Sequence, residues 1–406
     1  MKNSFDALLR ESRESTAYMI RGITAVCRRI GPRPPGSAGE REAAEYLAGV
    51  LERDCGCADV RIEAFTEHPD AFYGYFWFSA AFDCLCALSF FVRPWLSIVF
   101  GSAALLLFLF QFGLYRQVID PLFPRKRSVN VTAVRPCPGE VRRRVLLNGH
   151  MDAAWEFPLN YHFGGVVFEI PGVVAVIGVL YYIALAVCAL CGHTAGLHTA
   201  ALWGLLFLPF FLLVGCTYNP RRVVDGANDN LSGCWMGIAV LREMERLGVS
   251  PAHTEIGVLL TGSEEAGLRG ARAWCAAHGG DRDVPTYILT FDTIHDPRFL
   301  MVNRRDLNGT VRADPALSEL FLASAAELGI PCRRGWVPPM GGATDSAAFT
   351  QGGFRSVGIT GLNHRLEPYY HTRRDSWDNL NEAGLSNCYR AAVRALECID
   401  RGELDG

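Results

Sequence analysis

Residues 255–270 read EIGVLLTGSEEAGLRG, a stretch that joins a buried strand to a polar turn. The apolar run at 255–261 is typical of a β-strand, and the two glutamates after it precede a helical pattern near 267–279. This order of strand, turn and helix recurs along the C-terminal half of the chain. Further strands are expected at TYILTF (286–291) and SVGIT (356–360), and helices at about 230–247, 315–328 and 377–402. The alternation predicts an α/β fold, with a mainly parallel mixed sheet flanked by helices.

The N-terminal half adds two helices and three strands. Residues 3–30 and 38–54 have the spacing of amphipathic helices, separated by a Pro- and Gly-rich break at 31–36. Ser37 is a candidate N-cap for the second helix, with Glu40 three residues later as in a capping box. The expected strands are 59–65, 128–134 and RVLLNGH (144–150).

Four apolar runs interrupt this pattern, at 72–92, 95–115, 171–191 and 197–216. Each has about 20 residues, the length that a helix needs to cross the hydrocarbon core of a bilayer. We interpret them as two transmembrane hairpins inserted in one catalytic domain, so a lipid bilayer is an expected partner. The hairpins cover 72–118 and 166–216, and the catalytic domain comprises 1–71, 119–165 and 217–406.

The overall composition gives no sign of nucleic-acid binding. The chain carries 39 Lys and Arg against 42 Asp and Glu, a net charge of −3, so no global positive field is present. Its 14 cysteines fit free thiols in a long apolar chain better than a disulfide scaffold, and this indicates a reducing compartment. Residues 1–22 lack the apolar core of a secretory signal.

Basic residues beside the apolar runs predict an orientation, because cytoplasmic flanks of membrane helices are enriched in Lys and Arg. One side of the four runs has only Arg93. The other side has Arg116, Arg125, Lys126, Arg127, Arg221 and Arg222. We therefore expect an integral protein of the cell membrane whose catalytic domain faces the cytoplasm. A homo-oligomer is compatible with this arrangement.

Acidic and histidine residues gather at the ends of the expected strands and in the loops beyond them. They are His150 and Asp152 of RVLLNGHMD, Asp225 and Asp229 of DGANDNLSG, Glu264 and Glu265, Asp292 of YILTFDTIHD and His371 of PYYHTRRDSWDNL. Each alone has an ordinary explanation, since an Asp before a helix is usually an N-cap. Together they offer imidazole and carboxylate, the ligands of zinc sites that stay open to substrate. Two histidines and three carboxylates can hold two ions if one carboxylate bridges them.

In these motifs the chain resembles the di-zinc aminopeptidases, which share their fold with glutaminyl cyclases and glutamate carboxypeptidases. The resemblance covers everything except the four apolar runs. Its motifs, in order, are GPRPPGSAGEREAAEYLAGVLE, SVNVTAV, GHMD, GANDNLSG, SEEAGLRGA, TFD and HTRRDSWDNL. The chain departs from the family where the second apolar hairpin separates His150 from Asp229, which a short loop normally joins.

The resemblance implies a metal site and its ligands. His150 and Asp292 would bind one zinc ion, Glu265 and His371 would bind a second, and Asp229 would bridge the two. The implied cofactor is therefore two Zn²⁺ per chain.

The resemblance also assigns roles to four residues that do not bind metal. Glu264 would be the catalytic base, Asp152 would orient His150 through its second ring nitrogen, and Tyr370 would donate to the oxyanion. Asp345, in GGATDSAAF, falls where the family has an acidic residue near the amino end of the substrate.

The function implied is that of a membrane-anchored aminopeptidase, which removes N-terminal residues from peptides with water activated between two zinc ions. One alternative is an acyltransferase like glutaminyl cyclase, with a single zinc on Asp229, Glu265 and His371. The other is a non-catalytic receptor or scaffold on the same fold. All five ligands are present, which favours an enzyme, and His150 with Asp152 favours two metals.

Overall fold

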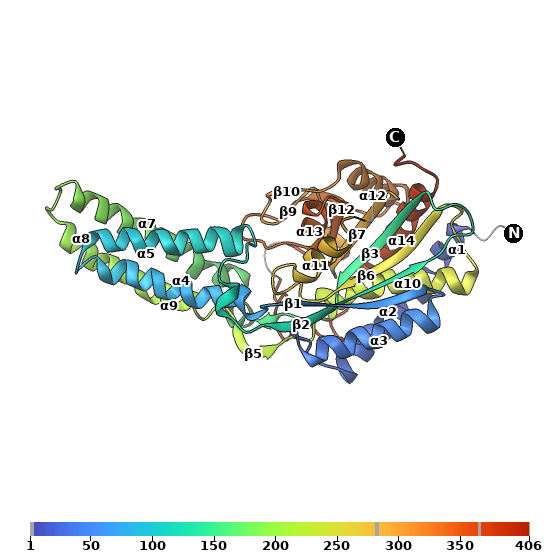
Figure 1. Ribbon diagram of the computed structural model, residues 1–406, viewed down its shortest axis with the longest axis horizontal. Helices are drawn as coiled ribbons and strands as arrows, with labels where there is room; N and C mark the ends of the chain where they lie inside the picture. Colours follow the sequence, from blue (N-terminus) through green and yellow to red (C-terminus); the bar gives the residue numbers. More distant parts are fainter. Residues whose placement is uncertain (1–3, 281–283, 364–366, 406) are drawn as a thin grey trace.

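The computed structural model describes residues 4–280, 284–363 and 367–405. Its centre is an eight-stranded sheet in the order β1-β2-β6-β3-β7-β12-β8-β11 (Figure 1). The strands are β1 (Ala58–Glu67), β2 (Lys126–Arg135), β6 (Thr254–Thr261), β3 (Arg143–His150), β7 (Thr286–Ile294), β12 (Arg355–Gly361), β8 (Leu300–Asn303) and β11 (Arg333–Gly335). The pairs β6–β3, β3–β7, β7–β12 and β8–β11 are parallel and the other three are antiparallel. The predicted α/β fold with a mainly parallel mixed sheet is confirmed.

Helices cover both faces of this sheet, because successive side chains of a strand point to opposite faces. In β3, Leu147 faces a large core and Leu146 a smaller one. The helices against the large core are α1 (Phe5–Arg10), α2 (Ser12–Arg29), α3 (Ala38–Asp54), α10 (Ser232–Leu247), α12 (Pro315–Glu327) and α14 (Glu382–Asp400). The smaller core lies under α11 (Arg269–His278) and α13 (Asp345–Gln351).

Most predicted elements are present, with a few differences at their ends. The helix expected at 3–30 is two helices that meet at Glu11, and the last helix begins at Glu382, five residues later than expected. Asn381 caps it, since its side chain accepts a hydrogen bond from the Gly384 amide. The short strands β8 and β11 and the helix α13 were not anticipated, because each is too short to show a periodic pattern.

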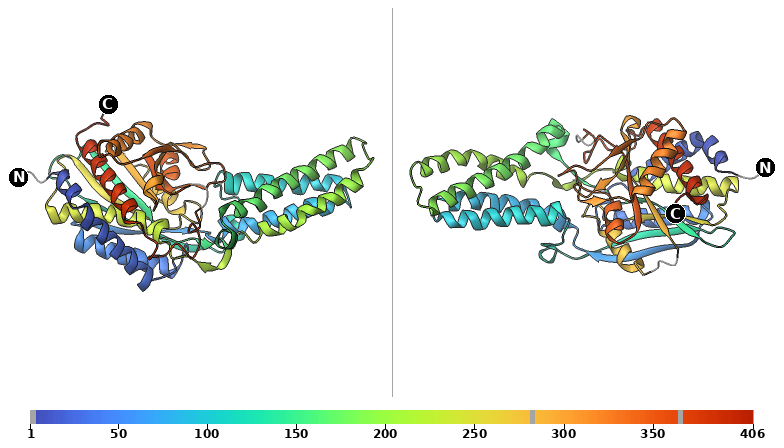
Figure 2. Two further views of the ribbon diagram at one scale, coloured as in Figure 1. Left: turned by 180° about the vertical axis from the view of Figure 1, so that it is seen from behind. Right: turned by 90° about the horizontal axis from the view of Figure 1, so that it is seen from above.

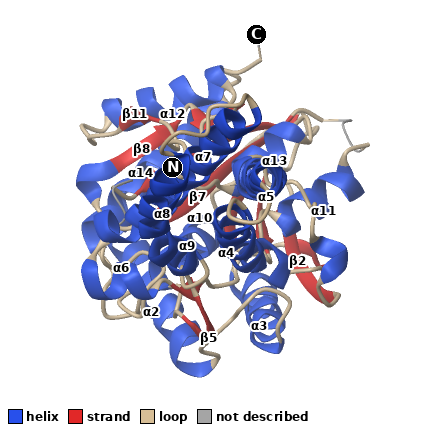
Figure 3. Cartoon of the chain, turned by 90° about the vertical axis from the view of Figure 1, so that its left-hand side faces the viewer, coloured by secondary structure: helices blue, strands red, loops and turns tan. Residues whose placement is uncertain are grey.

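The four apolar runs form a separate bundle of helices that projects from one end of the α/β domain, away from both termini (Figures 1 and 2). Figure 3 looks at this bundle end-on, with the sheet behind it. Its segments are α4 (Asp70–Ser89), α5 (Pro94–Leu107) continued by a wider turn at Phe108–Gly113, α7 (Gly165–Leu190), α8 (Leu197–Gly204) and α9 (Leu208–Val214). Among the described residues, four helical segments are long and apolar enough to span a membrane, at Asp70–Ser89, Pro94–Gly113, Gly165–Leu190 and Leu197–Val214.

Each hairpin leaves and re-enters the α/β domain through a pair of antiparallel strands. The first is closed by β1 and β2, whose register ends at the pair Glu67 and Lys126. The second is closed by the two short strands β4 (Trp155–Glu156) and β5 (Asn219–Val223). Both insertions therefore begin and end at one point, and the central sheet continues past them without a break.

Candidate metal centre

The five predicted ligands lie together at one edge of the sheet. His150 is the last residue of β3, Asp292 lies near the end of β7, and Glu265 follows β6. These three strands are neighbours, in the order β6-β3-β7, so their carboxyl ends meet. Asp229 comes from the turn before α10 and His371 from the loop before α14. The structure therefore brings together all five residues that the motifs singled out.

Asp229 lies between the two histidines. Its Oδ1 atom is 3.2 Å from His150 Nε2, and its Oδ2 atom is 3.2 Å from His371 Nε2. His371 Nε2 is also 3.2 Å from Glu265 Oε1. Ligand atoms of His150, Asp229 and Asp292 lie within 4.8 Å of one another, as do those of Asp229, Glu265 and His371. Two groups of three ligands thus share one carboxylate.

The charges of this buried cluster do not balance. Burial raises the pKa of Glu264 and Glu265, and burial together with the nearby Asp229 raises the pKa of Asp292 to about 8. Burial lowers the pKa of His371, but Glu265 and Asp229 outweigh it and raise that pKa to about 10. Four carboxylates beside two imidazoles leave an excess of negative charge with little access to water.

Several atoms of the cluster lack hydrogen bonds although they are fully buried. Within the described residues, both ring nitrogens of His150, Oδ2 of Asp229 and Oε1 of Glu265 have no hydrogen-bond partner. Buried polar atoms are rarely left in this state. A divalent cation would supply both the missing contacts and the missing positive charge, and imidazole with carboxylate suits zinc. The residues present therefore fit the metal that the motifs imply.

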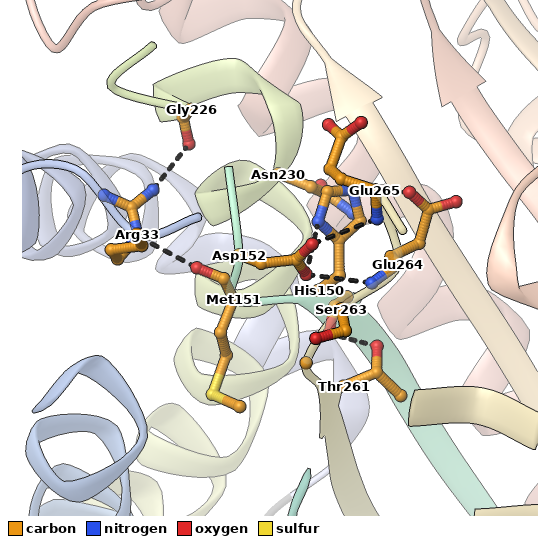
Figure 4. A network of polar contacts seen from close by, with 12 residues as sticks. Arg33, His150, Met151, Asp152, Gly226, Asn230, Thr261, Ser263, Glu264 and Glu265 are labelled. Atoms are coloured by element: carbon orange, nitrogen blue, oxygen red, sulfur yellow. Dashed lines mark hydrogen bonds and ion pairs between the residues drawn. The ribbon is translucent and has the colours of Figure 1, made fainter. Parts of the chain in front are cut away.

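Asp152 lies beside the histidine and holds the glutamate turn (Figure 4). Its Oδ1 atom is 3.4 Å from His150 Nδ1 and accepts a hydrogen bond from the Glu264 amide at 3.1 Å. Its Oδ2 atom accepts a hydrogen bond from the Glu265 amide at 3.0 Å. The orienting role of Asp152 stays a prediction, whereas its contacts to the two backbone amides are a second task that the motif did not reveal.

Glu264 and Tyr370 both face the cavity beside the ligands. Glu264 Oε2 is 3.8 Å from His150 Nε2, so this carboxylate borders the cluster without a hydrogen bond to it. The Tyr370 ring is stacked on that of His371, with ring centroids 4.1 Å apart. Asp345, in contrast, is buried behind the cluster, where it accepts a hydrogen bond from Thr261, and it does not line the cavity. Its contact with a substrate amino group stays a prediction.

A second carboxylate, Asp375, fixes the turn that carries the bridging ligand. Its Oδ2 atom accepts a hydrogen bond from the Asp229 amide at 3.1 Å, and its Oδ1 atom accepts two from Asn228. Asn230 ties the other end of the turn to β7 by donating to the carbonyl of Phe291 at 2.8 Å. Asp375 stands in the motif HTRRDSWDNL, which gives it no predicted role, because its partner is 146 residues away.

Arg33 and Glu40 support the site from the N-terminal segment. The buried guanidinium of Arg33 donates to the carbonyls of Met151 at 2.8 Å and Gly226 at 3.4 Å, and so joins the two ligand-bearing loops (Figure 4). It also donates to the Asp225 carbonyl at 2.7 Å. Glu40 accepts hydrogen bonds from the amide and hydroxyl of Ser263, directly before the glutamate pair. The capping contact of Ser37 with the Glu40 amide is confirmed at 3.2 Å, but the pattern gave no sign of the long-range contact.

Tyr73 reaches the cluster from the first inserted hairpin. Its hydroxyl donates to Glu265 Oε2 at 3.4 Å and lies 3.4 Å from His371 Nδ1. The residue stands in the first turns of α4 and is buried. In the sequence Tyr73 is only one aromatic residue of the apolar run at 72–92. The bundle is thus in direct contact with the candidate metal centre.

Residues 209–396 match the peptidase family described as peptidase family M28. A zinc aminopeptidase from Bacillus subtilis is 14% identical, with a TM-score of 0.53 and 94% of each chain covered. An aminopeptidase from Aneurinibacillus sp. strain AM-1 is 12% identical, with a TM-score of 0.56 and coverage of 97% of this chain and 96% of that one. A Fimbriiglobus ruber glutaminyl cyclase is 13% identical, with a TM-score of 0.56 and 94% of each chain covered. No curated protein sequence gives a significant match.

The fold and the matched segment define a zinc metallopeptidase. The match to peptidase family M28 covers 209–396, and the fold as a whole is similar to that of zinc aminopeptidases and glutaminyl cyclases, as the motifs indicated. The solved structures are less than 25% identical and establish the fold alone.

Proposed function

We propose that the chain is a membrane-anchored exopeptidase that uses two zinc ions and acts as an aminopeptidase on peptides. The observation that carries this proposal is the placement of Asp229, whose two oxygens face two different histidines at 3.2 Å each. A single-metal site would need only the group of Asp229, Glu265 and His371. The second group, which adds His150 and Asp292, supports two ions that share Asp229.

The residues around the cluster have distinct tasks in amide hydrolysis. When bound, zinc would lower the pKa of a water molecule and polarise the substrate carbonyl. Glu264 lines the cavity and can accept the proton of the attacking water and pass it to the leaving amine. Tyr370 also lines the cavity, where its hydroxyl can donate to the oxygen that becomes negative. Asp152 keeps His150 and the Glu264–Glu265 backbone in position.

Metal content tests this proposal against the cyclase alternative. The purified protein, dialysed against zinc and then freed of excess metal, should contain two zinc ions per chain. It should also release fluorophores from aminoacyl substrates in a zinc-dependent way. One zinc per chain, together with cyclisation of glutaminyl peptides and no aminoacyl hydrolysis, would establish the acyltransferase instead.

We also infer that the four apolar segments cross a bilayer and that the catalytic domain faces the cytoplasm. The outer surface of the bundle is apolar, with Leu180, Trp203 and Leu206 each more than half exposed. The far end of the bundle carries one basic residue, Arg93, whereas six basic residues lie near the α/β domain.

Two measurements test this placement. Alkaline carbonate should leave the protein in the membrane fraction, and release into the supernatant would show that the helices do not span. In sealed, right-side-out cells, an external protease should leave residues 223–406 intact. Digestion of that region from outside would reverse the orientation.

A further inference from the structure

A continuous cavity of about 280 Å³ connects the candidate metal centre with the interior of the helix bundle. Its walls include Asp229, Glu264 and His371 at one end. At the other end they include Ser79 and Asp83 of α4 and Val179 of α7. The cavity therefore extends from the polar edge of the sheet into the part of the molecule that we place in the bilayer.

The depth of this cavity follows from positions along the helices. Tyr73 contacts Glu265, and Asp83 lies ten residues further along α4, which corresponds to about 15 Å at 1.5 Å per residue. On α7 the lining residues Phe168, Gly172 and Val179 share one face of the helix, at intervals of four and seven residues. Asp83 and Val179 are the deepest lining residues of their helices, and they mark the inner end.

The open space results from small side chains on facing helices. Ser79, Ala104 and Gly172 line the cavity from α4, α5 and α7. A Cβ atom at Gly172 would meet only the terminal methyl of Met340, at 3.5 Å, so the space beside Gly172 is open. Larger residues at these positions would fill the space, as side chains do elsewhere in the bundle around Tyr182 and Phe211.

The lining favours a hydrocarbon chain over an extended peptide. Between the metal centre and Asp83 the walls are mainly aromatic and aliphatic, with Phe76, Phe108 and Val176 among them. An extended peptide would carry backbone N–H and C=O groups into this space, and each unpaired group is costly. A hydrocarbon chain has no such groups and gains free energy with every methylene buried.

In the described part of the cavity lining, no carboxylate outside the cluster lies near the metal centre to bind a free α-amino group. Among the described residues that line the cavity, the carboxylates outside the cluster are Asp83 at the inner end and the exposed Glu169. Asp345, the expected partner of such an amine, is buried behind the cluster. On the acyl side of the scissile bond, a hydrocarbon chain of the substrate would therefore contact more of the cavity wall than an α-amino group would.

We propose that the substrate is an amphiphilic amide with a single unbranched hydrocarbon chain on the acyl side, and that this chain lies between α4, α5 and α7 as far as Asp83. The inference rests on the proposed amide hydrolysis and specifies its substrate class. Water adds to the carbonyl, the C–N bond breaks, the carboxylate keeps the chain, and the amine leaves with the proton. The chain has two chemical sources, a fatty-acyl amide or a peptide whose N-terminal residue bears a long apolar side chain.

Two matched substrate series distinguish these sources. One consists of alkanoyl amides of an aminocoumarin from two to sixteen carbons, and the other of the corresponding 2-aminoalkanoyl amides. In the preferred series KM should fall about three- to fourfold per added methylene until the chain reaches Asp83, and rise beyond that length. Preference for the 2-aminoalkanoyl series indicates a peptide, and preference for the alkanoyl series a fatty-acyl amide. A KM independent of chain length in both series overturns the inference and leaves the peptidase proposal intact.

Variants locate the chain within the bundle. Gly172→Phe should remove most of the gain in kcat/KM from short to long chains, because the new ring occupies the cavity. Ile177→Phe is the matched control, since Ile177 lies on α7 but is 52% exposed on the outer surface, and its chain-length profile should equal the wild type. Equal zinc content and elution volume verify that both variants are folded. An unchanged profile in Gly172→Phe contradicts the proposal.

A binding measurement without added metal separates this inference from the proposed activity. A fatty acid with a diazirine at its far end, photolysed with the membrane-embedded protein, should label peptides within 72–83 and 168–179. Gly172→Phe should abolish this labelling, and Ile177→Phe should not. Labelling of the outer bundle surface alone overturns the inference. If the cavity is labelled but the protein hydrolyses neither substrate series, the binding site for the hydrocarbon chain is supported and the proposed function is refuted.

Discussion

In the α/β domain the charged side chains of the candidate metal centre are buried, whereas in the bundle apolar side chains cover the outer surface. His150, Asp229 and Asp292 are buried at the end of a sheet whose two faces are closed by helices. In the four apolar segments only 22–50% of the residues are buried within the protein. Soluble domains rarely expose so large an apolar surface, and this difference supports the proposed membrane placement of the bundle.

The contrast also shows how one chain accommodates both regions. Each hairpin is closed at its base by antiparallel strands, so it adds length without changing the pairing of the sheet. The two regions nevertheless meet at Tyr73, which belongs to the bundle and contacts the ligand Glu265. Variants in each region measure how independent the two regions are.

Asp229→Ala should abolish hydrolysis and remove both zinc ions, because this carboxylate is shared by the two groups of ligands. The bundle should be unaffected, so the variant should still resist carbonate extraction. Metal analysis and membrane fractionation of the same preparation measure both effects. Retention of one full equivalent of zinc would show that Asp229 does not bridge.

Glu264→Gln should lower kcat by about 10²- to 10⁴-fold with both zinc ions retained, because an amide cannot accept the proton of the attacking water. Glu265→Gln is the matched comparison and should weaken zinc binding. Kinetics with parallel metal analysis distinguish the two. Equal loss of zinc in both variants would mean that the roles of the adjacent glutamates are assigned incorrectly.

Ile177→Arg should reduce membrane integration, since an Arg at the centre of a spanning helix costs about 2.5–3.5 kcal/mol. Ile177 lies at the middle of α7 and is 52% exposed. The control is Ile62→Arg on β1, where an Ile 43% exposed faces water and the change should be within about 0.5 kcal/mol. The fraction retained after carbonate washing measures the difference. Similar behaviour of the two variants would contradict a membrane-spanning bundle.

Asp152→Asn should weaken zinc binding by about 10- to 100-fold, because the histidine loses its orienting carboxylate. The new side-chain amide can also place an N–H group against the backbone amides of Glu264 and Glu265, from which the Asp152 carboxylate accepts hydrogen bonds. Competition with a zinc chelator measures the change. Unaltered affinity would restrict Asp152 to a structural role.

Glu67→Gln should make the protein less sensitive to alkaline pH. Burial raises the pKa of Glu67 to about 8, although the Ser263 hydroxyl and Arg269 lower it. A carboxyl whose pKa is raised on folding stabilises the protein below its unfolded value of 4.5, and this stability is lost as the pH rises through 8. The Tm of the variant relative to wild type should therefore increase by a few degrees between pH 5 and 9. A constant difference would show that Glu67 does not titrate in this range.

The sequence by itself determined the α/β fold, the apolar segments and the residues of the candidate metal centre. These features could be predicted because each depends on a local pattern. Apolar strands are followed by the polar site residues, amphipathic helices have a regular spacing of apolar residues, and a membrane-spanning helix needs about 20 apolar residues. His150, Glu265 and Asp292 could be expected at one edge because carboxyl ends of parallel strands meet there.

The supports of the site and the direction in which it opens follow from tertiary contacts that no local pattern predicts. Arg33, Glu40 and Asp375 act on residues far away in the chain, and no local pattern records a hydrogen bond across 146 or 223 residues. Tyr73 resembled any other aromatic residue of an apolar run until the hairpin was placed against Glu265. The cavity between the metal centre and the bundle depends on side chains from three helices and the sheet edge, so it exists only once these elements are packed together.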